Sequence, residues 1–78
     1  MKYPLVTVVW DDACSRTGWQ PADSVDPTPK RCSSSGYLVK RTKDAVVLMG
    51  TVTADGDACN GIVIPRTMVK VVHHEHRV

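Results

Sequence analysis

The sequence predicts a small, mainly β domain: a five-stranded barrel of the SH3-like or Sm-like kind with a long loop after its first strand. Three observations lead to this prediction. The chain has 78 residues, so it forms one domain with a limited core. Valine dominates the apolar residues and phenylalanine is absent, and β-branched residues favour strands. Short strand-like runs alternate with turn-rich segments, and no run has the length and periodicity of a helix.

The first predicted strand covers residues 5–10 and reads LVTVVW. Apolar or β-branched residues occupy both of its faces, which is typical of a strand buried on both sides. Asp11 and Asp12 end the strand. Because neighbouring side chains of a strand point to opposite faces, these two carboxylates are interpreted as a solvated strand end and not as a catalytic pair.

Residues 13–35 form the predicted long loop, which contains three prolines and no regular apolar pattern. Proline is tolerated at the first position of a helical turn, so a short turn is expected near Pro21. A structureless segment of this length is uncommon in a compact domain and is usually functional where it occurs. The loop is therefore the first place to look for a binding surface.

A hairpin of residues 37–41 and 45–53 follows, and Gly50 within its second strand predicts a bulge or a sharp bend. Residues 54–61 form a polar loop, in which Asp55–Gly56 indicates a hairpin turn; the further oxygen ligands of a calcium loop are missing. The remaining elements are a short strand, a 3₁₀ turn and a last strand, at residues 62–64, 65–67 and 68–72. The domain is expected to span 1–74, with 75–78 as a polar tail.

Alternation of apolar residues along these strands predicts the core. The side chains expected to be mostly buried are Val6, Val8, Trp10, Leu38, Val46, Leu48, Val52, Ile62, Ile64, Val69 and Val71. The last strand is apolar apart from Lys70, and such a short, valine-rich edge strand is expected to pair with or pack on a second copy of the chain. We therefore expect a homo-oligomer.

The chain contains three cysteines, Cys14, Cys32 and Cys59, and an odd number argues against a closed disulfide framework. We expect three reduced thiols, with a Cys14–Cys32 bridge across the long loop as the alternative. Residues 73–76 read HHEH, and Cys32 or Cys59 would be conceivable further ligands. A chain end does not hold four ligands in a fixed tetrahedron, so neither a metal site nor a cofactor is predicted.

The charge pattern and the motifs exclude more than they identify. The formal net charge is +2, which neither requires nor excludes a phosphate-bearing partner. No phosphate-binding glycine loop and no nucleophile elbow occurs, so we predict no catalytic residue and no enzymatic activity. Neither a signal peptide nor a membrane span is predicted, and no membrane partner is expected.

Trp19 is the predicted anchor of a binding surface, because tryptophan and arginine are enriched at binding hot spots. Arg16, Lys30 and Arg31 would hold an anionic group beside its ring. The alternative is that Trp19 folds back and plugs the open end of the barrel. If the loop folds back, Lys30 and Arg31 would join Tyr37, Lys40 and Arg41 in one basic edge. Such an edge combines stacking on bases with contacts to phosphates. Otherwise these cations are a solvated hairpin tip or the protection of an edge strand.

Three segments carry a resemblance to a known family: VVWDDA at 8–13, CSSSGYLV at 32–39 and IPRTMV at 64–69. Their order resembles a family of small, poorly characterised proteins encoded by tailed bacteriophages. The resemblance leaves out the long loop and the tail, and it carries over no catalytic residue. It implies an accessory protein that is made and used in the cytoplasm of an infected bacterium.

Together these observations predict a non-enzymatic binding protein. Its target would be a host protein, for example one used in antiviral defence, or a small nucleotide that serves as an immune signal. A nucleic-acid-binding module that uses the basic edge is one alternative, and a small virion or structural component is another.

Overall fold

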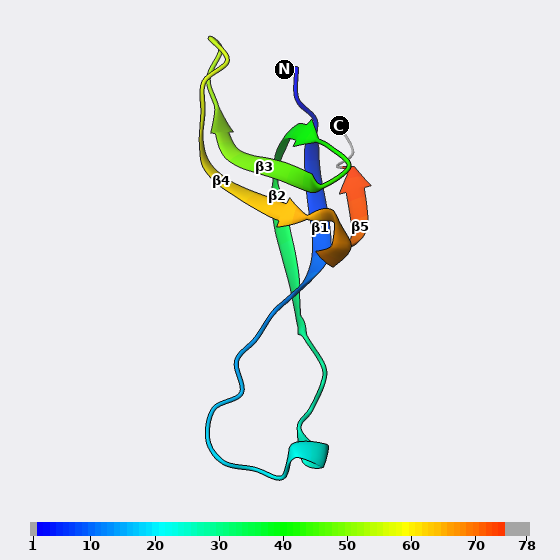
Figure 1. Ribbon diagram of the computed structural model, residues 1–78. Coiled ribbons are helices and arrows are strands. Elements are labelled where there is room, and N and C mark those ends of the chain that lie inside the picture. Colours follow the sequence, from blue (N-terminus) through cyan, green and yellow to red (C-terminus); the bar gives the residue numbers. More distant parts are fainter. Residues whose placement is uncertain (1, 75–78) are drawn as a thin grey trace.

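The computed structural model describes residues 2–74 and contains one five-stranded antiparallel sheet (Figure 1). Its elements are β1 (Leu5–Asp12), η1 (Ala22–Ser24), β2 (Lys30–Arg41), β3 (Ala45–Val52), β4 (Ala58–Pro65), η2 (Arg66–Met68) and β5 (Val69–His74), where η marks a 3₁₀ turn. The strand order across the sheet is β4-β3-β2-β1-β5. The prediction of a mainly β domain is confirmed. Within the described residues β4 and β5 are two open edges, so the expected closure into a barrel is not observed.

The second strand begins at Lys30, so the long loop ends at residue 29, six positions earlier than expected. Asp12 pairs with Lys30, and the register continues to Leu5 and Tyr37. Two serines of this segment, Ser34 and Ser35, bond through their hydroxyls to side chains of β1. The indole N–H of Trp10 donates to the Ser34 hydroxyl at 3.0 Å, and Thr7 and Ser35 share a hydrogen bond of 2.7 Å. These side-chain bonds allow a polar run to continue the ladder.

Of the bulge or sharp bend expected at Gly50, the bulge is not observed. The β3–β4 register is the same on both sides of Gly50, so no bulge lies there. One register shift in β2 leaves Val39 as an extra residue, and another in β5 leaves Lys70 as an extra residue. β3 and β4 also curve together away from β1 (Figure 1). The sheet is therefore bent, and its two bulges contribute to this bend.

The core is small and lies on one face of the curved sheet. Its fully buried side chains are Val6, Val8, Val46, Leu48 and Ile64. All five were expected there. Of the other expected core residues, Trp10, Leu38, Val52 and Val69 are half-buried.

Two expected core residues are exposed: Ile62 at 36 % and Val71 at 43 %. The extra residue Lys70 reverses the alternation of β5, so Val72 packs against the core and Val71 faces outward. Ile62 lies on an edge strand, and no further strand among the described residues covers it.

The polar connection between β1 and β2 forms an arm, residues 13–29, that extends from the end of these two strands away from the sheet (Figure 1). The arm gives the protein extents of 54 × 23 × 23 Å and a radius of gyration of 16.0 Å. A compact chain of this length would have a radius of gyration of about 11–12 Å. The arm therefore lies outside the packed part of the molecule.

Residues 2–74 contain no helix of sufficient length and apolarity to cross a membrane.

Candidate binding arm

Arg16 joins the two limbs of the arm. Its guanidinium donates to the Thr28 carbonyl at 3.2 Å and to the Cys14 sulfur at 3.2 Å. It also forms an ion pair with Asp26, with 4.0 Å between Nη2 and Oδ2. Arg16 was expected to hold an anion beside Trp19, but both of its terminal nitrogens bond within the arm. Its position thus indicates a structural role there.

The arm contains further local bonds but no packed core. The Thr28 N–H donates to the Asp26 carboxylate at 3.0 Å, and hydrogen bonds from Thr28 lower the pKa of Asp26, with a smaller contribution from Arg16. The turn η1 is closed by Ser24, whose N–H and hydroxyl both donate to the Pro21 carbonyl. This turn confirms the one expected near Pro21. Every residue of the arm is nevertheless exposed.

Trp19 lies on this arm with its side chain entirely in solvent, at a relative exposure of 105 %. The adjacent Gly18 has a φ of +87°, a conformation that side chains other than glycine rarely adopt. The ring therefore does not plug an open end of the sheet, so this alternative is wrong in the observed conformation. A fully exposed tryptophan remains available for a partner.

The base of the arm is fixed by ion pairs among three strands. Asp11 accepts a hydrogen bond from Arg31 on β2, and Lys70 of β5 lies 3.7 Å from its other oxygen. The bond from Arg31 is the main cause of the lowered pKa of Asp11, and the same bond raises the pKa of Arg31. Arg31 is therefore paired with a neighbouring carboxylate on β1.

The predicted basic edge is not assembled. Lys30 and Arg31 begin β2 whereas Lys40 and Arg41 end it, which separates the two pairs by about 30 Å at the usual rise of a strand. The arm extends away from the second pair instead of folding back toward it (Figure 1). Tyr37 lies between them on β2, half-buried and paired with Leu5 and Met49. The predicted binding residues therefore occupy separate places.

All three cysteines are free, so the alternative of a Cys14–Cys32 bridge is wrong in this structure. The Cys14 thiol donates to the Thr28 carbonyl at 3.7 Å, which places Cys14 opposite Thr28. Thr28 precedes Cys32 by four positions, or about 13 Å of extended chain. A disulfide requires Cα atoms within about 7 Å.

No group of metal-ligating side chains occurs within residues 2–74. His73 and His74 belong to β5, where they pair with Thr7 and Val6. Glu75 and His76 of the HHEH segment lie outside the described residues, as does the rest of the predicted tail.

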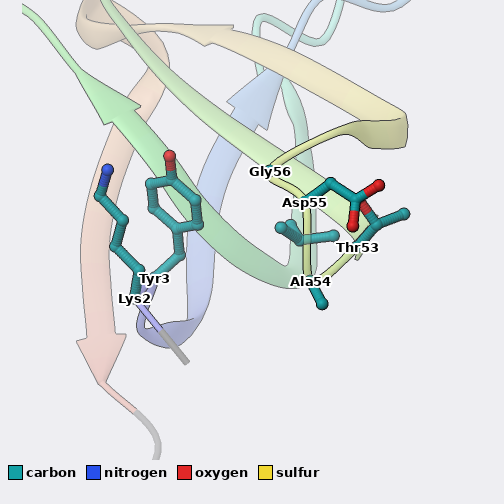
Figure 2. Close-up of a pocket in the computed structure, with 7 residues that line it drawn as sticks. Lys2, Tyr3, Thr53, Ala54, Asp55 and Gly56 are labelled. Atoms are coloured by element: carbon teal, nitrogen blue, oxygen red, sulfur yellow. The ribbon is translucent and has the colours of Figure 1, made fainter.

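A shallow hollow of about 460 Å³ lies between the segment before β1 and the β3–β4 turn (Figure 2). Lys2 and Tyr3 form one wall, and the turn residues Thr53 to Gly56 form the other. The Pro4 carbonyl accepts a bond of 2.8 Å from the Leu38 N–H, which fixes the first wall on β2. None of the predicted binding residues lines this hollow, and no sequence motif indicated it. The two segments that line it, the one before β1 and the β3–β4 turn, lie at the end of the molecule opposite the arm (Figure 1).

Comparisons of the chain with protein-family models, with curated proteins and with solved structures find no match.

Proposed function

We propose that this protein is a non-enzymatic binding protein that engages a protein partner through the arm, with Trp19 as the anchor. The observation that carries the proposal is the complete exposure of Trp19 on an extended segment whose residues are all exposed. Exposed tryptophan is unfavourable in water unless it binds, and tryptophan is among the residues most enriched at binding hot spots. A segment held outside the core in this way has no role in packing.

The charges of the arm favour a protein partner over a phosphate-bearing one. The arm has one cation, Arg16, and two carboxylates, Asp23 and Asp26, which gives a formal charge of −1. The guanidinium of Arg16 is bonded within the arm. No cation beside Trp19 is left to contact a phosphate, whereas phosphate contacts dominate nucleic-acid affinity. An apolar pocket on a protein is the surface that fits the indole ring.

The exposed area of the molecule supports the same proposal. The accessible surface is 5969 Å², whereas a folded monomer of this mass exposes about 4700 Å². The excess exceeds the roughly 800 Å² that each partner buries in a standard interface. Surface of this amount is available to a partner without any loss of packing within the chain.

We further propose that the scaffold is an SH3-like arrangement. Its support is the strand order, together with the long connection between the first two strands and the 3₁₀ turn between the last two. On this scaffold the arm is an elongated recognition loop. The phage resemblance adds a host protein in the bacterial cytoplasm as the proposed target, which the arm would sequester or inhibit by occupancy.

The test compares tagged wild-type protein with Trp19→Ala, using Val25→Ala as a matched control in the same arm. Each variant is incubated with an extract of the bacterial host, and the captured proteins are quantified by mass spectrometry. We expect one partner to be retained by wild type and Val25→Ala and to bind Trp19→Ala about 30-fold more weakly, the equivalent of about 2 kcal/mol.

The melting temperatures of the three proteins should agree, because neither arm side chain packs against the core. Equal capture by all three proteins would contradict the anchor role of Trp19. A melting temperature of Trp19→Ala that is many degrees lower would show that the ring has a packing role instead.

A further inference from the structure

We infer that two copies of the chain associate through β4, with Val63 of one copy opposite Val63 of the other across a two-fold axis. The two sheets would then continue into each other as one antiparallel sheet. β4 is an edge strand and pairs with β3 alone among the described strands. This inference is independent of the arm and of the function proposed for it.

The ladder defines which backbone groups of β4 face the free edge. The Arg66 N–H donates to the Asp44 carbonyl at 2.9 Å, so these two residues occupy a hydrogen-bonded position. Hydrogen-bonded and non-bonded pairs alternate along an antiparallel ladder, so Ile64 and Ile62 also bond to β3. The N–H and C=O groups of Val63 and Gly61 therefore point outward.

The outward N–H and C=O groups of β4 can bond to those of a second copy in one register. When Val63 lies opposite Val63 of the second copy, the N–H of each residue donates to the C=O of the other. Each Gly61 N–H then meets a Pro65 carbonyl of the second copy, and the missing N–H of proline falls at the end of the pairing. The interior of the paired segment therefore loses no hydrogen bond to proline.

Charge distinguishes β4 from the other edge strand and favours a second copy of the chain as the partner of β4. Around a two-fold axis a strand meets its own copy, so any charge in the centre would meet a like charge. The eight residues of β4 read ACNGIVIP and contain no charged side chain. β5 contains Lys70 at a bulge, a feature that protects edges from pairing. The inference therefore places association at β4, whereas the sequence led us to expect it at the last strand.

The exposed side chains of β4 also favour this strand as the interface between two copies. Val63 is 64 % exposed and Ile62 is 36 % exposed, an apolar pair on an edge that nothing in residues 2–74 covers. Pairing would place a cross-strand neighbour of the second copy beside each of these residues and would lengthen the sheet.

The first test is the mass in solution by sedimentation equilibrium, from low micromolar to several hundred micromolar protein. We expect the wild-type chain to reach twice 8.6 kDa as its concentration rises. Val63→Lys should remain at the monomer mass, because two ammonium groups would meet at the axis. Val71→Lys, a matched change at an exposed valine beside the other edge, should still dimerise.

The second test is covalent and does not depend on the stability of the lysine variants. In a chain whose three cysteines are replaced by serine, Val63→Cys should form an intermolecular disulfide on mild oxidation, because Cα atoms opposite each other in a ladder are about 5.5 Å apart. Val71→Cys should not form one. A wild-type chain that stays monomeric at every concentration would overturn the inference. A dimer that survives Val63→Lys, or equal cross-linking of both cysteine variants, would place the interface elsewhere.

Discussion

Leu48 is 1 % exposed and belongs to a core that has only four other fully buried side chains within residues 2–74. With no phenylalanine in the chain, each of these aliphatic residues supplies a large share of the buried apolar area. Leu48→Ala is expected to lower the free energy of unfolding by about 2–4 kcal/mol, because it removes apolar contacts and leaves a cavity. Urea denaturation measures this loss. Val25→Ala in the exposed arm should change the same quantity by less than about 0.5 kcal/mol, and a loss below 1 kcal/mol for Leu48→Ala would contradict this core.

Single-residue burial was predictable where alternation is uninterrupted. Val6 and Val8, like Val46 and Leu48, are spaced by two on regular strands, and all four are buried. The same rule failed for Val71, since an inserted residue in β5 changes the face of everything that follows. A bulge leaves no distinct trace in a sequence of valines and one lysine.

Asp11 connects three strands at the base of the arm, through Arg31 on β2 and Lys70 on β5. Its pKa in the folded state is lower than the ordinary 3.8, chiefly because of the hydrogen bond from Arg31. A lowered folded-state pKa stabilises the fold above the unfolded pKa, and this stabilisation disappears as pH falls through the folded value.

We therefore expect Asp11→Asn to lower the melting temperature at neutral pH and to reduce its fall between roughly pH 5 and pH 2. The measurement is thermal denaturation across this pH range. Asp12→Asn is the matched control, because Asp12 is the adjacent residue and forms no ion pair within residues 2–74. Equal acid sensitivity of wild type and Asp11→Asn would show that the ion pairs do not support the fold.

At the level of elements, the sequence allowed the number of strands, a short turn near Pro21 and the 3₁₀ turn before the last strand to be predicted. The start of β2 was missed because serine is read as a loop residue, whereas Ser34 and Ser35 bond to β1 side chains. Whether such a segment forms a strand depends on the residues that pair with it, and these lie more than twenty positions away in the chain. The arrangement of the cations was missed for a related reason: the length of β2, which separates them, was underestimated.

At the scale of the whole molecule, three separate regions differ in chemistry. The arm presents an indole ring and a slight negative charge, and β4 presents an uncharged edge. The hollow is lined by the segment before β1 and by the β3–β4 turn, which lie at the end opposite the arm (Figure 1). A partner bound by Trp19 would therefore leave β4 free, so a dimer would display two arms. Two arms joined in this way would bind a multivalent target more tightly than one.

The extended arm is itself testable through the shape of the protein in solution. Small-angle scattering of the Val63→Lys variant, chosen to hold the chain monomeric, should give a radius of gyration near 16.0 Å. In a second variant an Asn-Gly turn replaces residues 13–29, which is feasible because Asp12 and Lys30 already pair and this dipeptide closes two-residue hairpins. That variant should remain folded, since the arm contains no core residue, and its radius of gyration should fall to about 11 Å. A value of about 11–12 Å with the arm intact would mean that the arm folds back on the sheet in solution. Trp19 would then contact the sheet and lose the exposure from which its anchoring role is inferred.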